Sequence, residues 1–469
     1  MKNRRPEGWV PRKQRSSQAR LVAFNVLRAV EEDDAYANLI LPHHIRRAYL
    51  NKQDAAFATN LTYGTLRLRG RWDAIISRSS HDRPFEAIDS DVLQLLRLGC
   101  HQLLDFKTPP HAAINETVAI ARNELGQGAA GFVNAILRRI NERTSEWKTI
   151  LEQSTASRTQ FLSVWYSQPR WIVEEFERAL LLDGREEDLE AVLNANNDAA
   201  KVALVCRGIS PEDLRERITR AKMGWEDPYL VPSAVLLESG DPHRLWPIQD
   251  GSAGVQDEGS QLISDIFVAI PVEGKDTQWL DVCAGPGGKT ATIASAAPEG
   301  VEIFANEPQP HRLDLVENAV APWAERVMLR EGDGRTIGEE QPDYFDRILV
   351  DAPCSGLGSL RRRPESRWRK QPSDITDLTR LQRELLASAF KALRPGGALL
   401  YTTCTPVVAE TRTIIDEFLA NTPAAREENL VPHAQQLALK PLGDGPHIQL
   451  WPDLHHSDAM FMALIRKDQ

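Results

Sequence analysis

The sequence has 469 residues, of which 42% are hydrophobic and 26% charged, which excludes a wholly disordered chain and predicts about two to four globular domains. No apolar run approaches the ~18 residues that span a bilayer, and the basic N-terminus lacks an apolar signal segment, so we expect a cytoplasmic protein that binds no membrane. Five cysteines exclude a disulfide framework and fit a reducing compartment, where a specialised cysteine is more often catalytic than structural.

The net charge of −10 is unevenly distributed along the chain. Residues 1–150 hold 23 Lys and Arg against 16 Asp and Glu, whereas the rest hold 33 against 50. A basic N-terminal part on an acidic body is compatible with localised binding of a polyanion. An uneven spread of solvated charges explains the same counts, because average charge is a weak guide to partners.

The N-terminal part has a helical pattern after a polar start. Residues 1–20 are basic and predict a flexible tail. Apolar side chains then recur at helical spacing from Leu21, in the run DVLQLLRLGCHQLLDF and in residues 113–125 and 129–141. No strand signal interrupts residues 21–142, so we predict an all-helical domain over residues 21–150.

The middle of the chain, residues 151–245, has a mixed pattern. Residues 171–182 are typical of a helix, 202–206 of a short strand, and 211–221 of a helix that Ser210 caps. Proline, glycine and short apolar runs follow. We predict a small α+β domain here.

Strand and helix patterns alternate from residue 246 to residue 469. The predicted strands cover residues 278–283, 301–306, 327–331, 347–351, 398–403 and 460–465. Such alternation is typical of a doubly wound α/β domain with a parallel sheet.

A glycine-rich turn, WLDVCAGPGGKT, follows the first of these strands. A Walker A phosphate loop would need glycine where this chain has Cys283, and a dinucleotide fingerprint would need glycine in place of Thr290. A loop that binds S-adenosylmethionine (SAM) and a plain tight turn between a strand and a helix are both compatible with this glycine-rich sequence. Glu307 and Asp333 follow the next two strands, where an open sheet holds its ligand, and this favours a nucleoside cofactor.

Cysteines follow the fourth and fifth predicted strands. Cys354 stands in DAPC and Cys404 in YTTC, whereas Cys100 and Cys206 fit ordinary buried positions. A thiolate is a strong nucleophile when its pKa is lowered. Two thiols beside a SAM loop indicate methyl transfer to an unreactive carbon such as carbon 5 of a pyrimidine, which becomes nucleophilic when a thiolate adds to carbon 6.

A basic segment, SLRRRPESRWRKQ, follows Cys354 closely. Lys and Arg neutralise phosphates, and an aromatic ring can stack on an unpaired base, so the segment predicts RNA contacts, with a solvated charged loop as the alternative. The candidate RNA-binding residues are Arg361, Arg362, Arg363, Arg367, Trp368, Arg369 and Lys370. His455 and His456 fit surface histidines, and we expect no metal site.

Several motifs together resemble a known family. DVCAGPGGKT, GDGR, FDRILVDAPCSGLGSLRRRPESRWR and YTTCT resemble the RNA 5-methylcytosine methyltransferases of the RsmB/Sun (Fmu) and NSUN superfamily. TPPHAAINETV and GFVNAILRRI resemble its NusB-like helical domain, and WYSQPRWIVEEF its RNA-binding linker. The resemblance implies a multidomain chain with an all-α NusB-like RNA-binding domain, a small α+β linker domain and a C-terminal Rossmann-like SAM-dependent methyltransferase domain.

The resemblance also implies roles for particular residues. Cys404 would attack carbon 6, Cys354 would assist release of the product, and Asp351 and Lys289 would hold the base. SAM, which becomes S-adenosylhomocysteine, would contact Cys283, Ala284, Gly285, Pro286, Gly287, Gly288, Lys289, Glu307, Arg312, Asp333 and Asp351. DNA cytosine methyltransferases instead use the cysteine of the Pro-Cys motif, so the second cysteine and the NusB-like domain argue against DNA as the substrate.

The implied substrate is RNA, and within RNA the small-subunit (16S) ribosomal RNA, because the NusB-like extension resembles the ribosomal branch of the family. Two alternatives stay open: a transfer RNA 5-methylcytosine methyltransferase, and a non-catalytic NusB-like RNA-binding or antitermination factor. The chain departs from the family pattern at Thr405, at Ala409-Glu410-Thr411 and at Asp458–Phe461. We expect a monomer.

Overall fold

The computed structural model describes residues 17–80 and 83–468. The predicted flexible tail covers residues 1–20, and residues 1–16 lie outside the described part of the chain. Residues 18–20 are helical, because the first helix begins at Gln18. The chain forms two compact units. One holds the described residues up to 173 together with 363–368, and the other holds 174–362 and 369–468.

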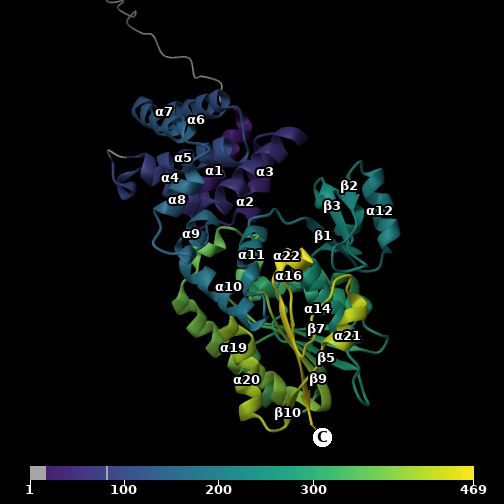
Figure 1. Cartoon of the computed structure of the whole chain (residues 1–469). Helices are drawn as coiled ribbons and strands as arrows, with labels where there is room; N and C mark the ends of the chain where they lie inside the picture. The colour runs from purple at the N-terminus through teal and green to yellow at the C-terminus, as the bar shows by residue number, and fades with distance from the viewer. Residues whose placement is uncertain (1–16, 81–82, 469) are drawn as a thin grey trace, which may run out of the picture. The chain divides into compact units, whose positions relative to one another are not determined.

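The first unit is all-helical in its described part, as predicted (Figure 1). Its hydrophobic core gathers fully buried side chains such as Phe24, Trp72 and Leu95. Asp89 caps the helix that carries Leu95 by accepting hydrogen bonds from the first free N–H groups. The helices are α1 (Gln18–Glu32), α2 (Ala37–Arg47), α3 (Lys52–Arg67), α4 (Arg69–Ser79), α5 (Ser90–Cys100), a π-turn (His101–Asp105), α6 (Pro110–Glu124), α7 (Gln127–Glu142), α8 (Trp147–Gln153) and α9 (Arg158–Trp165).

This helical unit contains a segment that is distant in the sequence, residues 363–368. Arg367 is fully buried and donates hydrogen bonds to the main-chain oxygens of Arg67 (3.2 Å) and Ser167 (3.0 Å). Glu365 accepts a hydrogen bond from the main-chain N–H of Ala37 (3.1 Å). The segment therefore completes the core of the helical unit.

We expect Arg367→Ala to destabilise the helical unit by about 2–4 kcal/mol, because it removes charge-assisted hydrogen bonds and leaves a cavity. Chemical unfolding followed by tryptophan fluorescence measures the change. The exposed Arg363, on the same segment, is the matched control, and its replacement by alanine should change stability by less than about 0.5 kcal/mol. Equal effects of the two variants would contradict a core role for Arg367.

The second unit begins with a small α+β part, as predicted. Its antiparallel sheet has the strand order β2-β3-β1-β4, and helix α12 packs on it through Leu214 and Ile218. The sheet extends past the predicted border at residue 245, because β4 pairs with the free edge of β1. The elements are β1 (Val202–Cys206), α12 (Pro211–Arg220), β2 (Gly224–Glu226), β3 (Val235–Ser239) and β4 (Ala253–Val255), with α10 (Arg170–Leu182), α11 (Leu189–Ala195) and α13 (Trp246–Gln249) around them.

The large sheet has the strand order β10-β12-β9-β8-β5-β6-β7. Strands β5 to β9 run parallel, whereas β12 is antiparallel to β9 and β10 is antiparallel to β12. The strands are β5 (Gln278–Asp281), β6 (Glu302–Glu307), β7 (Val327–Glu331), β8 (Phe345–Asp351), β9 (Leu393–Thr403), β10 (Ala425–Glu428), β11 (Ile448–Gln449) and β12 (Phe461–Lys467). The predicted parallel, doubly wound sheet is thus confirmed, and the last strand joins it antiparallel.

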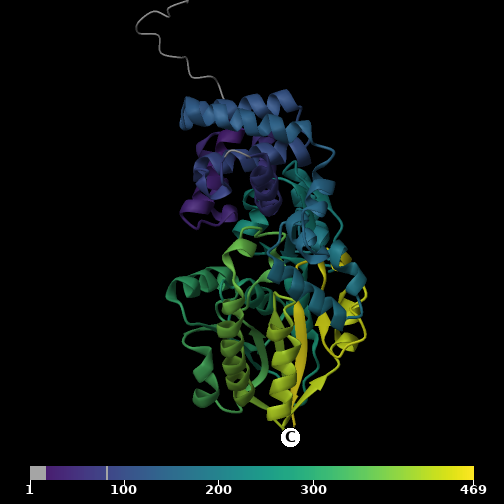
Figure 2. The same ribbon diagram turned by 60° about the vertical axis from the view of Figure 1, so that its left-hand side comes forward.

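Helices cover both faces of this sheet, and each face has its own hydrophobic core. In Figure 1, α14 lies on one side of the strands and α19 and α20 on the other, and Figure 2 shows the latter pair along the sheet. The helices of this part are α14 (Glu258–Ala269), α15 (Gly288–Ala296), α16 (Pro310–Val320), α17 (Ile337–Glu340), α19 (Pro372–Ala392), α20 (Arg412–Asn421), α21 (Val431–Ala434) and α22 (Pro452–His455). The short helix α18 (Ser366–Arg369) belongs, except for its last residue, to the helical unit. Over residues 17–80 and 83–468, no helix has the length and apolarity that a membrane crossing requires.

The strand order reverses between β5 and β8, which are neighbours in the sheet. Chain connections leave these two strands in opposite directions, so a crevice opens beyond their carboxyl ends. The glycine-rich loop follows β5 and the Pro-Cys motif follows β8. The fold therefore places both motifs at the position where open α/β sheets bind ligands.

Candidate active site

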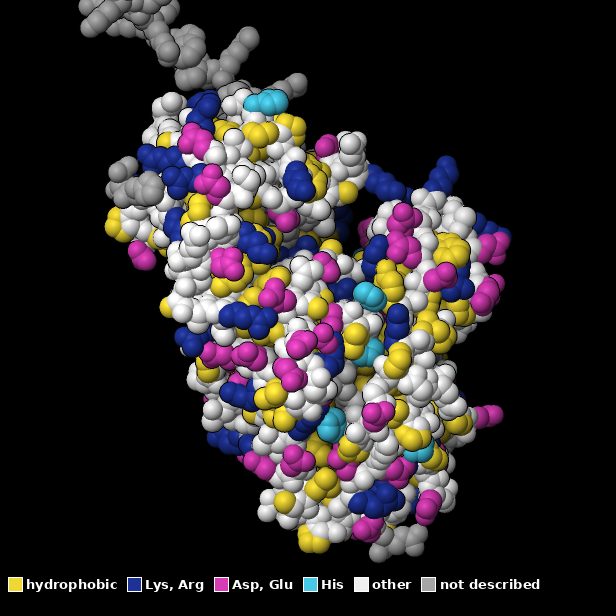
Figure 3. Space-filling view, in the orientation of Figure 1, with side chains coloured by type: hydrophobic (Ala, Val, Ile, Leu, Met, Phe, Trp, Pro, Cys, Tyr) yellow, Lys and Arg dark blue, Asp and Glu magenta, His cyan; other side chains and the backbone are white. Residues whose placement is uncertain are grey.

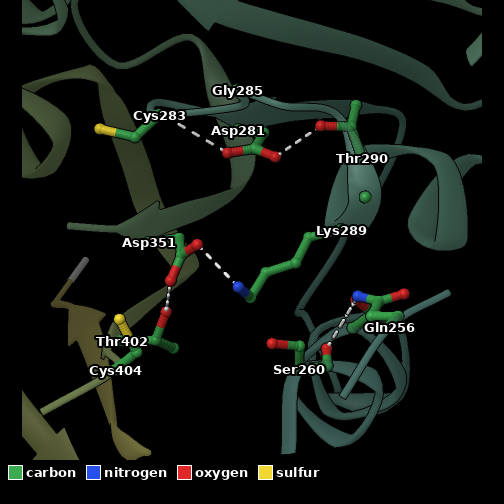
Figure 4. A network of polar contacts seen from close by, with 12 residues as sticks. Gln256, Ser260, Asp281, Cys283, Gly285, Lys289, Thr290, Asp351, Thr402 and Cys404 are labelled. Carbon is green, nitrogen blue, oxygen red and sulfur yellow. Dashed lines mark hydrogen bonds and ion pairs between the residues drawn. The ribbon is translucent and has the colours of Figure 1, made fainter. Parts of the chain in front are cut away.

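The glycine-rich loop between β5 and α15 is held from several sides (Figure 4). Asp281, buried at the end of β5, accepts hydrogen bonds from the Thr290 hydroxyl (2.7 Å) and the Cys283 N–H (3.3 Å). Burial raises the pKa of Asp281 to about 6. Arg312 of α16 donates to the Gly285 oxygen (2.7 Å). These contacts fix a main-chain cradle at the amino end of α15.

Two glycines are required for this cradle. Gly287 has φ +99°, and a Cβ there would lie 2.8 Å from the Val316 Cα of α16. A Cβ on Gly285 would lie 2.2 Å from a carboxylate oxygen of Glu307, which is 1% exposed and pairs with Arg312 (3.3 Å). Backbone close to a buried carboxylate after the second strand fits the amino-acid and ribose parts of SAM.

Most of the predicted SAM-binding residues are joined by direct contacts, but in the described part of the chain Asp333 is not joined to the others by such a contact. The loop Cys283–Lys289, Glu307 and Arg312 share direct contacts, and Lys289 reaches Asp351 (2.7 Å). Asp333 does follow β7, but Arg335 occupies its carboxylate with contacts of 2.6–3.0 Å. Asp333 shares its carboxylate with Arg335, and its contact with a nucleoside stays a prediction.

The two cysteines at the ends of β8 and β9 face each other. The Sγ atoms of Cys354 and Cys404 are 3.3 Å apart. The hydrogen bond between the two sulfur atoms favours a thiolate at 404 and a thiol at 354, and the negative charge of Glu410 adds to this by acting on Cys354. The Cys354 hydrogen bond and then Lys289 lower the pKa of Cys404, against burial and Asp351. The Cys404 contact, burial and Glu410 raise the pKa of Cys354 well above its ordinary value.

Asp351, Lys289 and Thr402 form a polar group beside the cysteines (Figure 4). The Lys289 ammonium donates to one Asp351 oxygen (2.7 Å), and the Thr402 hydroxyl donates to the other (3.0 Å). Burial opposes the charge of Lys289, but Asp351 outweighs it and raises the pKa of the lysine. A charged ammonium is therefore available beside Cys404.

Two contributors were not among the predicted site residues. Asp281 has a signal in the sequence, since it is the carboxylate nearest the end of the first parallel strand. Thr402 has none, because its contact depends on the register of β8 and β9, which places it opposite Asp351.

The basic segment after Cys354 differs from the predicted RNA-binding surface. Arg361 is buried and donates to the Ser457 oxygen (3.3 Å), and Arg362 pairs with the fully buried Asp458. Arg367 lies in the core of the helical unit. Arg361 and Arg367 are engaged inside the protein, so the prediction that they contact phosphates is wrong in this structure. Arg362 is exposed although it pairs with Asp458, so for Arg362 an RNA contact stays a prediction.

The rest of that segment is more accessible. Trp368 lies against Gly70, where a Cβ would be 2.6 Å from its ring, and Arg69 covers the ring at 5.8 Å from its centroid. Its ring is thus already stacked. Arg363 is exposed and Arg369 and Lys370 are partly exposed, and for these three an RNA contact stays a prediction. Figure 3 shows basic and acidic side chains interspersed on the face turned to the viewer.

The remaining predictions concern isolated residues. Cys100 is buried, as expected, and Cys206 is partly buried. His455 was predicted at the surface but is 3% exposed, because it bonds to the Trp451 N–H (2.9 Å) and approaches the Pro441 oxygen (3.1 Å). His456 is exposed. In the described part of the chain, no cluster of three or more His, Cys, Asp or Glu is arranged to hold a metal ion.

A doubly wound sheet with this cradle at its switch point fits a methyltransferase that uses SAM. Sequence profiles agree: one described as 16S rRNA methyltransferase RsmB/F matches residues 268–466, and that of the NusB family matches residues 17–142. The chain belongs to the RsmB/F family of methyltransferases, in the form that carries an N-terminal NusB domain.

Relatives match along nearly the whole chain. Rv1407 of Mycobacterium tuberculosis, designated a methyltransferase, is 43% identical over 98% of this chain and 99% of its own. Ribosomal RNA small subunit methyltransferase B of Pseudomonas putida is 33% identical over 89% of this chain and 94% of its own.

Solved structures show the same fold. The crystal structure of PH0851 has a TM-score of 0.78 at 20% identity and covers 97% of this chain and 99% of its own. NSun6 from Pyrococcus horikoshii, solved with SFG, has a TM-score of 0.53 at 18% identity and covers 64% of this chain and 98% of its own.

Proposed function

We propose that this protein transfers the methyl group of SAM to carbon 5 of a cytidine in small-subunit ribosomal RNA, through a covalent bond between Cys404 and carbon 6. The observation that carries the proposal is the pair of Sγ atoms 3.3 Å apart, with the Lys289–Asp351 pair beside them. Five free cysteines, two of them in this pair, fit use in a reducing cytoplasm.

The proposed reaction starts with the Cys404 thiolate. It adds to carbon 6, a C6–S bond forms, and the electron pair of the C5=C6 bond moves onto carbon 5. Asp351 and Lys289 hold the polar edge of the base and stabilise the charge that develops in the ring. SAM supplies the electrophilic methyl group that carbon 5 then accepts.

Release reverses the addition. A base removes the proton from carbon 5, its electron pair restores the C5=C6 bond, and the C6–S bond breaks to return the thiolate of Cys404. A thiol of lower pKa is a better leaving group. The hydrogen bond from Cys354 stabilises the departing thiolate, and this is the role that we assign to Cys354.

The choice of ribosomal RNA rests on the relatives. The Pseudomonas putida protein is named for the small ribosomal subunit, and the matching family description names 16S rRNA. Both thiols are partly buried, so the cytidine must leave its base stack to reach them, which favours a loop or an unpaired nucleotide.

The test uses purified protein, isotopically labelled SAM and RNA from cells that lack the gene, separated into ribosomal and transfer fractions and offered free and as small-subunit particles. Mass spectrometry of the nucleosides should find labelled 5-methylcytidine in the ribosomal fraction. Label only in transfer RNA would correct the substrate, and label in another nucleoside would overturn the mechanism. SAM binding without transfer to any RNA would favour a non-catalytic RNA-binding role.

The rate of covalent adduct formation should rise with pH, because the reactive form of Cys404 is the thiolate. RNA with 5-fluorocytidine at the target traps the adduct, since fluorine cannot leave as a proton. Lys289→Met removes a positive charge that lowers the pKa of Cys404, so the rise should move to higher pH. Lys289→Arg keeps the charge and is the control. An unchanged profile in Lys289→Met would contradict electrostatic activation by Lys289.

A further inference from the structure

Behind Cys354 lies a buried carboxylate that the proposed reaction does not use. Glu410 belongs to a short 3-10 turn after Cys404 and has no exposed surface. One oxygen accepts a hydrogen bond from the Ser355 N–H (2.7 Å), and the other accepts one from the Ser355 hydroxyl (2.5 Å). Glu410 thus holds the residue directly after Cys354.

A second side chain holds the residue directly before Cys354. The Gln382 amide, from helix α19, donates to the Pro353 oxygen (2.8 Å) and also to Glu410 (3.1 Å). The same carboxylate therefore anchors both sides of the cysteine, once directly and once through Gln382. Such a clamp fixes the direction in which the Cys354 side chain points.

The clamped loop is also tied to the loop of the other cysteine. The hydroxyls of Ser355 and Thr405 are 2.9 Å apart, and the Gly358 N–H donates to the Cys404 oxygen (2.9 Å). A Cβ on Gly358 would lie 2.8 Å from that oxygen. The approach of the two loops is thus set by several contacts, with Glu410 at their centre.

The charge of Glu410 acts on Cys354 as well. Burial raises the pKa of Glu410, and the hydrogen bonds from Ser355 oppose this rise by favouring the carboxylate. The carboxylate in turn contributes to the raised pKa of Cys354, after the Cys404 contact and burial. A negative charge at this place therefore favours the neutral thiol of Cys354.

We infer that Glu410 is a positioning residue that holds the thiol of Cys354 against the sulfur of Cys404 during release of the methylated product. The inference rests on the proposed function, because it concerns the step in which the C6–S bond breaks. The carboxylate of Glu410 accepts hydrogen bonds from Ser355 and Gln382, which are not part of the cofactor cradle. Its loss should slow release far more than it slows methyl transfer.

Two single-turnover measurements with ribosomal RNA and labelled SAM test this inference: the label transferred, and the fraction of labelled RNA that stays bound to denatured protein. For Glu410→Ala we expect release to slow by about tenfold, equivalent to about 1.4 kcal/mol, so that a methylated adduct accumulates, while methyl transfer changes by less than about threefold. Equal slowing of both steps, or no accumulation, would overturn the inference.

Glu410→Gln keeps the side-chain shape, and it tests the positioning role of Glu410 if the alanine variant fails to fold. Without the negative charge, Cys354 should lose its proton at lower pH, and the decline of release at alkaline pH should begin earlier than in the unaltered protein. A profile identical to that of the unaltered protein would contradict the role. Glu428, which pairs with Arg466 (3.0 Å), offers Glu428→Gln as a control for general destabilisation.

A trap separates this inference from the proposed function. If 5-fluorocytidine RNA forms no adduct with Cys404 in the unaltered protein, the covalent mechanism fails, and the inference fails with it. If the adduct forms there but Glu410→Ala shows no selective defect in release, only the role of Glu410 is refuted.

Discussion

Replacement of Cys404 by alanine is expected to abolish methyl transfer, with a fall in kcat of about 10⁴-fold or more. The reason is chemical: carbon 5 of cytosine does not attack a methyl donor until a nucleophile has added to carbon 6. The proposed nucleophile is the thiolate of Cys404, whose sulfur lies 3.3 Å from that of Cys354. The measurement is the incorporation of labelled methyl groups into ribosomal RNA. SAM affinity, measured by calorimetry, should stay within about threefold, because Cys404 lies outside the loop that forms the cradle.

Cys206→Ala is the matched control for Cys404→Ala. Cys206 is a partly buried thiol on β1 of the small sheet, and burial raises its pKa to about 11, so it is a poor nucleophile. Its replacement should leave methyl transfer unchanged. Full activity in Cys404→Ala would refute the covalent mechanism, whatever the control shows.

Cys354→Ala is expected to give the opposite phenotype, in which the RNA is methylated once and then stays bound to the protein. Without the hydrogen bond from Cys354, the Cys404 thiolate is a poorer leaving group, so we expect multiple turnover to fall by about 100-fold or more while one adduct per enzyme accumulates. A denaturing gel shows the bound RNA, and mass spectrometry of the digested complex locates the link.

The double variant Cys354→Ala, Cys404→Ala is the control for this second result and should form no adduct. An adduct that persists in the double variant would place the covalent bond elsewhere. Rapid turnover in Cys354→Ala would instead show that release proceeds without this thiol, and would also remove the basis for the role of Glu410.

The elements that carry the cofactor cradle and both cysteines were predictable because their signals are local. Buried apolar runs alternate with helical patterns, and this alternation implies parallel strands whose carboxyl ends meet at one edge of a sheet. The motifs around Gly285, Cys354 and Cys404 each follow such a strand. Their convergence therefore follows from the order of motifs along the chain, without knowledge of any distance.

The basic segment shows where this reasoning fails. A run of arginines has the same composition whether it faces phosphates or donates to carbonyls inside a core. Arg367 donates to two main-chain oxygens from α3 and from the residues after α9, and Arg362 pairs with an aspartate almost a hundred residues away. No local pattern encodes partners so distant, so the burial of Arg367 and the pairing of Arg362 with Asp458 were not predictable.

The sequence alone determined the architecture and the methyltransferase family, and it predicted the two thiols of the proposed reaction, because periodicity and short motifs are properties of neighbouring residues. Only the tertiary structure decided which thiol is favoured as the thiolate, how Glu410 and Gln382 clamp Cys354, and which arginines stay accessible. Each of these depends on burial and on contacts between strands and loops far apart in the chain. Desolvation and charge pairing act through space, and their effects exist only once the chain has folded.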